Sequence, residues 1–226
     1  MFAKCADVTS DIDQFCAEAF QELGRLDVAV LNTGSVRDGS LQDVEPADFD
    51  DGFAVLVRPL IRATFAMQRA MAGRGGRIIL LATAAIQQPS AELVVSSTVR
   101  PSLLGFCKAA APGLADEGIT INCVCPGYVW TDGLQEMIRE VAVREGVGER
   151  NLKDRWIANV AMRRFAEPEE VAALVEFLGS EEAGYITGQA IAIDGGLLRH
   201  TSRAPWHETR EFGSRDQPDA AETGSQ

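Results

Sequence analysis

Apolar positions along this chain follow two patterns. One has the spacing of amphipathic helices, and the other consists of the short continuous runs that are typical of buried strands. Residues 10–24 carry apolar side chains at helical spacing, and Gly24 predicts the end of that helix. Short continuous apolar runs predict strands that are buried on both faces, as in a parallel sheet. The predicted strands are Leu26–Leu31, Arg77–Ala82, Ile119–Cys125 and Ala190–Ile193.

Longer helical segments separate these strands. Pro46 fits the first turn of the longest one, and Pro59 is expected to kink or divide it because proline removes an internal hydrogen bond. The alternation of strand and helix predicts an α/β fold with a Rossmann-like, doubly wound parallel sheet. The predicted helices cover residues 46–72, 96–115, 132–160 and 167–179.

Composition narrows the class of protein. A chain of 226 residues is long enough for one domain with a real core, and its net charge of -12 argues against nucleic acid and anionic membrane surfaces as partners. The sequence has no apolar stretch near the ~20 residues of a membrane helix and no signal-peptide pattern at its start, so a cytoplasmic location is predicted.

The composition shifts to charged and small residues near Thr201. We therefore predict one domain over residues 1–200 and a flexible polar tail over 201–226. The alternative is that the tail is an arm that docks on a partner subunit through Trp206.

The number and positions of the cysteines and histidines argue against several kinds of functional site. The five cysteines show no zinc-ligand spacing, and Cys123 and Cys125 are predicted to be buried free thiols on one face of a strand. The two histidines, His200 and His207, lie at the start of the tail. No metal site and no histidine-dependent nucleophile are therefore expected in the domain.

Several short motifs occur in a fixed order. They are Asp7-Val8-Thr9, Leu31-Asn32-Thr33-Gly34, Pro126-Gly127-Tyr128-Val129-Trp130-Thr131, the segment Met162–Ala172, Tyr185–Gln189 and Asp194-Gly195-Gly196. In this order and at this spacing, the chain resembles the short-chain dehydrogenase/reductase (SDR) family from about Asp7 to Gly196. The resemblance implies an oxidoreductase fold that assembles into dimers and tetramers.

The resemblance also implies a nicotinamide cofactor site, of which only parts are recognisable. Family members begin with a strand, a glycine-rich turn and a helix that bind the cofactor pyrophosphate, but no such turn occurs before residue 24. The sequence is therefore interpreted as an N-terminally truncated member that lacks the first strand–helix units, and no NAD(P) binding is expected. The vestigial cofactor residues are Asp7, Asn32, Gly34, Pro126, Gly127 and Thr131.

The family's catalytic Asn, Ser, Tyr and Lys fall on altered positions. Aligning the motifs places Leu56 in the Asn slot, Thr83 in the Ser slot, Ser96 in the Tyr slot and Arg100 in the Lys slot. An aliphatic hydroxyl is far less acidic than a phenol beside an ammonium group. No residue is therefore assigned a catalytic role with its family chemistry intact.

Each of the remaining polar positions has two interpretations. The guanidinium of Arg100 offers a planar fork for an anion, or it pairs with a neighbouring carboxylate or with solvent. The hydroxyls of Thr83 and Ser96 act with Arg100 on an anionic substrate, or they are a strand-end group and a helix cap, with Ser97 as the alternative cap.

Two functional hypotheses follow. The first is a non-catalytic subunit that joins an active SDR paralogue, itself, or both through helices 46–72 and 96–115. A dehydrogenase of the 2-[hydroxy(phenyl)methyl]-succinyl-CoA type, which pairs an active with a degenerate subunit, is an example of such a complex. The second is a non-redox enzyme, such as a lyase, a cyclase or a dehalogenase-like protein, that uses Arg100 and Thr83 on an anionic substrate.

Overall fold

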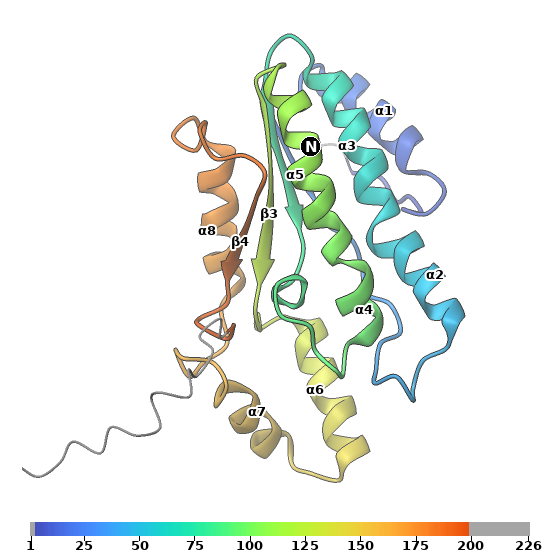
Figure 1. The fold of residues 1–226 in the computed structure, drawn as a ribbon, viewed down its shortest axis with the longest axis vertical. Helices are drawn as coiled ribbons and strands as arrows, with labels where there is room; N and C mark the ends of the chain where they lie inside the picture. The colour runs from blue at the N-terminus through green and yellow to red at the C-terminus, as the bar shows by residue number, and fades with distance from the viewer. Residues whose placement is uncertain (1–2, 199–226) are drawn as a thin grey trace, which may run out of the picture.

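The computed structural model describes residues 3–198, and its sheet contains four parallel strands in chain order (Figure 1). The register confirms the parallel arrangement throughout, since every neighbouring pair of strands runs in the same direction. The predicted α/β fold with a Rossmann-like parallel sheet is therefore confirmed. The strands are β1 (Val28–Leu31), β2 (Gly76–Leu81), β3 (Ile119–Pro126) and β4 (Gln189–Ile193).

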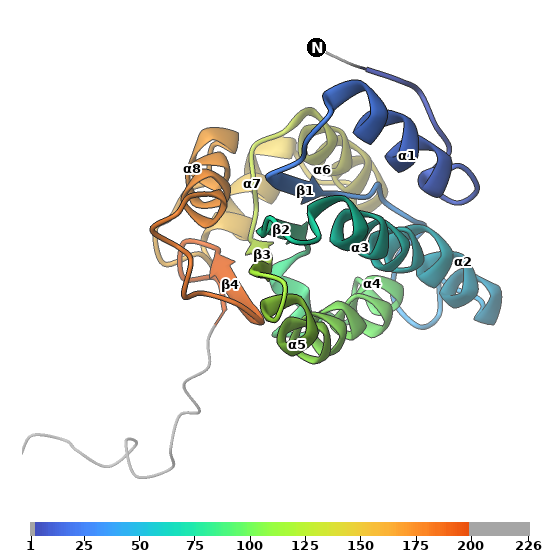
Figure 2. The same ribbon diagram turned by 90° about the horizontal axis from the view of Figure 1, so that it is seen from above.

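Helices cover the two faces of the sheet unequally (Figure 2). On one face, α3 (Arg58–Met71) lies against β1 and β2, and α5 (Pro101–Ala115) lies against β3 and β4. On the other face, α8 (Pro168–Gly179) packs against β2 and β3. The helix α1 (Ile12–Leu23) packs on α3. It ends at Gly24, whose φ of 70° is the left-handed conformation that glycine permits.

Burial in the core explains why the strands are so apolar. Strand β3 is buried along almost its whole length, because helices cover both of its faces. Beyond the carboxyl ends of the strands, α6 (Asp132–Glu145) and α7 (Glu149–Ile157) form a lobe of their own (Figure 1). None of the helices in the described part of the chain combines the length and apolar character that a membrane span requires.

Three of the predicted helices are each divided in two. The segment predicted at 132–160 forms α6 and α7, which are separated by Gly146 and Gly148. The segment predicted at 46–72 forms α2 (Pro46–Leu56) and α3, which meet at Val57, just before Pro59. The segment predicted at 96–115 forms α4 (Val94–Val99) and α5, which meet at Arg100, just before Pro101. The division near Pro59 was expected from the sequence, whereas the division at Arg100 was not, because Pro101 was expected in the first turn of one helix. In both cases the proline lacks the backbone N–H that would continue the helical hydrogen bonds.

One prediction about β1 is wrong. The apolar run was expected to be buried on both faces, yet Val28 and Val30 are 40% and 46% exposed while Ala29 is buried. β1 is the edge strand of the described sheet, and α8 packs on β2 and β3 instead, so one face of β1 is less covered.

The start of α8 is fixed by a reciprocal cap. The Glu167 carboxylate caps the backbone of the helix, and Glu170 accepts the backbone N–H of Glu167 at 2.8 Å. Arg164 donates two hydrogen bonds to Glu170, at 2.6 and 2.7 Å, and lowers the pKa of Glu170 to about 2. Glu169 and Glu170 make the first turn of α8 acidic, which complements the helix dipole.

The interior also contains the predicted free thiols. Cys123 and Cys125 are fully buried in β3, and burial raises the pKa of Cys125 to about 11. The polar tail predicted at 201–226 lies outside the described residues, so its flexibility stays a prediction.

Candidate functional site

The candidate site lies at the carboxyl ends of β1, β2 and β3, which meet at one edge of the sheet. In parallel α/β folds, ligands bind at this edge because the loops after the strands converge there. Asn32 follows β1, Thr83 follows β2, and Pro126 ends β3. The junction between α4 and α5 brings Ser96 and Arg100 toward the same edge, because Arg100 reaches the loop after β1.

Ser96 and Arg100 contact each other directly. The Nε of Arg100 donates a hydrogen bond to the Ser96 hydroxyl at 3.1 Å, and an Nη group donates to the carbonyl of Gly34 at 3.2 Å. The one-turn spacing within the helical segment makes the first contact, because residues four apart lie on one face. Arg100 therefore connects the α4–α5 junction to the loop that follows β1.

A second contact to the same loop was not anticipated from the sequence. The Asp38 carboxylate accepts the backbone N–H groups of Val95 and Ser96 at 3.0 and 3.1 Å, and the N–H of Gly39 at 3.1 Å. The carbonyl of Gly39 accepts the N–H of Val94 at 3.0 Å. Asp38 therefore caps α4 from a distant part of the chain, and no local motif announces this role.

This geometry corrects the interpretation of Ser96 and Ser97 as helix caps. Ser96 lies inside the first turn of α4, and its own N–H is capped by Asp38. The hydroxyl of Ser97 donates to the carbonyl of Ser90 at 3.3 Å and accepts its N–H at 3.0 Å. The cap comes from another loop because a carboxylate can satisfy two backbone donors at once.

The charge of Arg100 is only partly compensated. Among the residues the structure describes, no carboxylate lies within salt-bridge distance of its guanidinium, and Asp38 acts on it only at longer range. Burial lowers the pKa of Arg100, and the negative charge of Asp38 opposes that shift. A half-buried cation without a paired anion is unusual, since buried charges are normally neutralised by a close partner.

The two other family positions have lost or redirected their polar groups. Leu56 is fully buried in the main core, so its slot is filled by hydrocarbon. The hydroxyl of Thr83 accepts the N–H of Ala85 at 3.4 Å and caps a short 3-10 helix, η1 (Ala84–Ile86). This 3-10 helix packs against α4 and α5, which places Thr83 near the site without a direct bond to Arg100 among the described contacts.

The loop after β1 has an open and incompletely satisfied surface. Asn32 is exposed, and the hydroxyl of Thr33 is buried without a hydrogen-bond partner among the described residues. An added Cβ on Gly34 would meet nothing within 4 Å. A buried hydroxyl without a partner costs free energy unless a ligand or water supplies the missing bond, so this strand end fits a ligand.

The other vestigial cofactor residues form hydrogen bonds with nearby groups of the chain. The Asp7 carboxylate accepts the N–H and hydroxyl of Thr9, both at 2.7 Å, which lowers the pKa of Asp7. Thr131 caps α6 through the N–H of Leu134 at 3.3 Å. Gly127 follows Pro126 at the end of β3 and donates to the carbonyl of Ile193 at 3.0 Å.

Aromatic rings stand beside this end of β3. Tyr128 stacks on Trp156 with ring centroids 5.3 Å apart and meets the edge of Phe165 at 6.3 Å. Lys153 lies over the ring of Trp130 at 4.7 Å. Burial raises the pKa of Tyr128, and the negative charge of Glu92 adds to the shift, so this phenol is a poorer acid than a free tyrosine. It does not replace the phenol that the Ser96 position lacks.

Known proteins resemble this chain over most of its length. A family described as enoyl-(acyl carrier protein) reductase matches residues 3–198. An acetoacetyl-CoA reductase of Rhizobium meliloti is 35% identical over 176 residues, which are 77% of this chain and 69% of that protein. An NADPH-dependent reductase of Bacillus subtilis is 30% identical over 182 residues, 79% of this chain and 69% of that protein.

A solved structure agrees with these sequence matches. The structure of an NADPH-dependent reductase involved in bacilysin biosynthesis superposes with a TM-score of 0.80 at 27% identity. The superposition covers 87% of this chain and 77% of that protein.

These relatives overturn the expectation that no cofactor is involved. Reductases that use NADPH by name share both the sequence and the fold of this chain, so a cofactor-binding fold is expected rather than absent. The sequence argument was wrong because it gave the absent glycine-rich turn more weight than the strand ends and loops that the chain shares with these relatives over residues 3–198.

Proposed function

This chain belongs to the short-chain dehydrogenase/reductase family, and we propose that it is an oxidoreductase subunit whose own site lacks the proton donor. It works in a hetero-oligomer with an active SDR dehydrogenase, for which the 2-[hydroxy(phenyl)methyl]-succinyl-CoA dehydrogenase type is an example. The observation that carries the proposal is the contact at 3.1 Å between the Arg100 guanidinium and the Ser96 hydroxyl.

That contact is unsuited to acid–base chemistry. A general acid works best when its pKa lies near the working pH, and an aliphatic hydroxyl is far from that range. Arg100 stays protonated and donates its hydrogen bond into the Ser96 oxygen, so it neither takes up a proton nor passes one on. Leu56 offers no polar atom that could hold a water molecule beside them.

The residues at the end of β1 fit the cofactor expected of the family. Asn32 is exposed, the Thr33 hydroxyl lacks a partner among the described residues, and Gly34 leaves room for a close approach. When bound, a nicotinamide cofactor supplies hydride-transfer chemistry. On this chain, Asn32, Thr33 and Gly34 would hold and orient it beside Arg100, which already contacts the Gly34 carbonyl.

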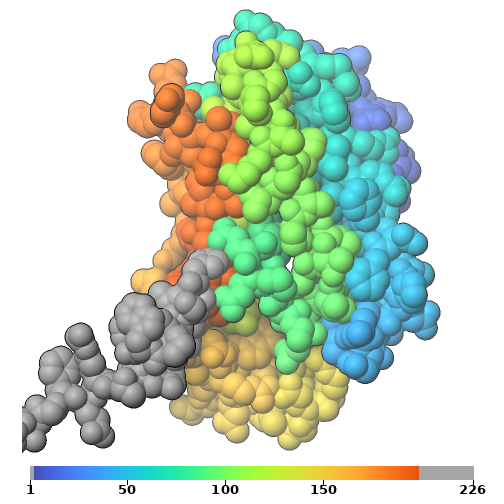
Figure 3. All heavy atoms as spheres, in the orientation of Figure 1, coloured from blue at the N-terminus to red at the C-terminus, as the bar shows by residue number. Residues whose placement is uncertain are grey.

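The helices predicted to mediate assembly keep apolar surface. Phe53 on α2 and Phe65 on α3 are 38% and 53% exposed. The surface over α2 and α3, drawn blue to cyan, adjoins that over α4 and α5, drawn green, on one broad face (Figure 3). Exposed aromatic side chains on these helices support association with another protein, because interfaces are enriched in them.

Co-expression with an SDR dehydrogenase from the same genome tests the proposal. Native mass spectrometry should give a mixed oligomer, and NADPH-dependent reduction of a ketone should require the dehydrogenase subunit. A Phe65→Lys variant should weaken the mixed oligomer, whereas Val143→Lys, which changes an 83% exposed valine on α6, should not. Ketone reduction by this chain alone at the rate of the mixed oligomer would contradict the proposal.

The charge of Arg100 favours a second candidate function. A half-buried guanidinium with no carboxylate of the described residues in salt-bridge range leaves donors that a phosphate or carboxylate group would satisfy. Together with Thr83, it supports the non-redox hypothesis of a lyase, cyclase or dehalogenase-like enzyme acting on an anion. Titration with inorganic phosphate, followed by the Nε–H resonance of Arg100, tests it. A saturable shift absent in Arg100→Met supports this candidate, and no shift refutes it.

A further inference from the structure

Two buried thiols face each other across the contact between α5 and β3. The sulfur of Cys107 on α5 lies 3.4 Å from the carbonyl oxygen of Ile121 on β3. The sulfur of Cys123 on β3 lies 3.9 Å from the carbonyl oxygen of Leu103 on α5. Each sulfur therefore contacts the element that carries the other one. A hydrogen bond joins the two thiols, and both residues are fully buried in the main core.

That hydrogen bond makes the two thiols unequal. Cys123 donates it, which lowers the pKa of Cys107 and raises the pKa of Cys123. Burial opposes the lowering at Cys107, and the positive charge of Lys108 assists it. A lowered pKa leaves more of a thiol in the thiolate form, which is the form that attacks an electrophile. Cys107 is therefore the better nucleophile, and a second thiol lies directly beside it.

A third thiol of β3 provides a comparison within the same strand. Cys125 is as buried as Cys123 and lies on the same face, because alternate residues of a strand share a face. Burial raises the pKa of Cys125 to about 11, so this thiol stays protonated near neutral pH. A substitution at Cys125 therefore controls for the loss of a buried sulfur atom without the loss of the reactive pair.

The helix α5 has a weak point next to Cys107. Pro112 lies inside α5 and has no N–H to donate to the carbonyl of Lys108, and Gly105 is a poor helix former. Lys108 is exposed, and the sulfur of Cys107 lies 4.0 Å from the carbonyl oxygen of Gln189, which is also exposed. Cys107 is thus buried yet close to solvent, so the opening of one helical turn brings it within reach of a small solute.

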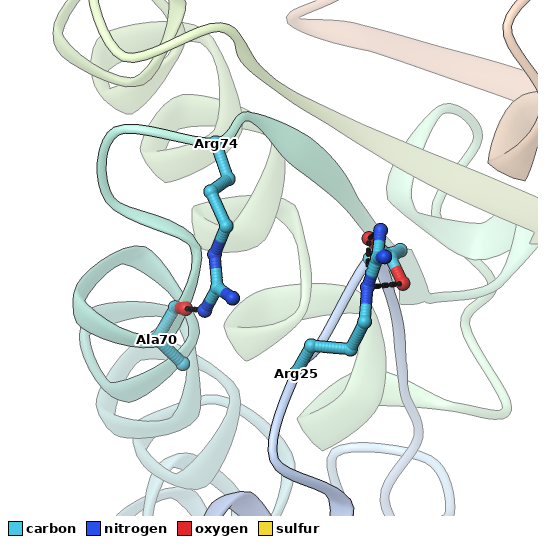
Figure 4. Close-up of polar contacts among 4 residues, drawn as sticks. Arg25, Ala70 and Arg74 are labelled. Carbon is cyan, nitrogen blue, oxygen red and sulfur yellow. Dashed lines mark hydrogen bonds and ion pairs between the residues drawn. The ribbon is translucent and has the colours of Figure 1, made fainter.

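The polar contacts at the amino ends of β1 and β2 are of another kind. Arg25 donates several hydrogen bonds to Asp27, the shortest 2.6 Å, and Arg74 donates to the carbonyl of Ala70 at 3.2 Å (Figure 4). Both contacts pair a guanidinium group with an oxygen acceptor, and a mild oxidant changes neither group. A response to such an oxidant is therefore expected from the sulfur atoms and not from these contacts.

We propose that a hydroperoxide converts Cys107 and Cys123 into a reversible disulfide, and that local opening of α5 admits it. The Cys107 thiolate attacks one peroxide oxygen. The O–O bond breaks, Cys107 becomes a sulfenic acid, and the departing oxygen takes up a proton to give an alcohol or water. The Cys123 sulfur then attacks the sulfenic sulfur, and the S–S bond forms as its proton and the sulfenic hydroxyl leave as water. The peroxide accepts the two electrons that the thiols lose.

Such a bond joins α5 to β3. Because α5 begins at Pro101, directly after Arg100, oxidation restrains the helix that follows this side chain. Disulfides that form and break with conditions are a means of sensing oxidants. This proposal does not rest on the proposed function, because neither thiol belongs to the candidate site.

Thiol counting and peptide mapping of the full chain test the disulfide. A Cys5→Ser background removes the exposed thiol and leaves four of the five cysteines. Hydrogen peroxide is the probe, followed by iodoacetamide in denaturant. Four thiols should be alkylated before peroxide and two after it, and dithiothreitol should restore four. In the same background, Cys107→Ala should keep all of its remaining thiols, whereas Cys125→Ala, the matched control, should still lose two.

A helix variant tests the route of access. Pro112→Ala returns an N–H to the Lys108 carbonyl, so it should slow disulfide formation roughly five- to tenfold without changing the final extent. A mapped Cys107–Cys123 bond that dithiothreitol splits, and that forms more slowly in Pro112→Ala, supports the proposal. Four alkylated thiols after peroxide overturn it, and so do a bond to Cys16 or Cys125, an irreversible sulfinic acid, or an equal rate in Pro112→Ala. Circular dichroism confirms that each variant is folded, and the bond mapped in the parent background needs no core substitution.

Discussion

Replacing Asp38 by alanine should destabilise the fold more than any other carboxylate substitution in its loop. The change removes the acceptor for the backbone N–H groups of Val95 and Ser96 and leaves both unsatisfied at the start of α4. Loss of a helix cap costs ~0.5–2 kcal/mol, and a partly buried donor without a partner adds about 1 kcal/mol or more. We expect a loss of about 2–3 kcal/mol.

Asp43→Ala is the matched control for this measurement. The Asp43 carboxylate accepts the N–H of Ser40 at 3.0 Å, and this hydrogen bond lies in an exposed turn of the same loop. Its loss should therefore cost less than about 1 kcal/mol. Urea unfolding of both variants gives the two free energies, and exchange of the Val95 and Ser96 amides should accelerate only in Asp38→Ala. Equal destabilisation by the two variants would refute the reasoning.

Three further substitutions test other parts of the structure. Glu170→Gln should flatten the loss of stability in acid: the folded-state pKa of Glu170 is lowered from 4.5 to about 2, so its contribution is complete above pH 4.5 and is lost as the pH falls toward 2. Urea midpoints over that pH range measure it, and equal slopes would contradict it. Gly127→Ala should cost about 1–3 kcal/mol, because its Cβ would lie 2.9 Å from the Cα of Asp194, whereas Gly34→Ala should be nearly neutral. Thermal unfolding separates these two, and a neutral Gly127→Ala would count against the packing. Leu56→Asn should cost about 2–4 kcal/mol as an unpaired amide in the core, measured by calorimetry, and an unchanged midpoint would show that the slot admits water.

The sequence contained most of the fold because local chemistry decides where elements begin and end. Apolar runs identified all the strands of the described sheet, and Pro59 indicated the division of one helix, whereas the division at Pro101 was not predicted. Exposure of β1 could not be read in the same way. An apolar run predicts a strand that can be buried, but whether it is buried depends on whether a helix from elsewhere in the chain packs over it.

The site was predictable only in part. Family motifs placed Ser96 and Arg100 in neighbouring roles, and the structure joins them by a hydrogen bond. The contacts of Asp38 with α4 and of Arg100 with Gly34 link residues that are far apart along the chain, so no spacing rule reveals them. The expectation of no NAD(P) binding was wrong for a related reason. It relied on the absent glycine-rich turn and gave too little weight to the strand ends that the chain shares with its relatives.

The order of the strands has a consequence for how the chain is made. Because β1, β2, β3 and β4 pair in the order in which they leave the ribosome, each new strand meets an edge that is already complete. Domains generally form from their N-terminal side during synthesis, and within the described sheet no strand is inserted between two earlier ones. The sheet can grow in one direction, with each crossover helix closing over the strand that precedes it.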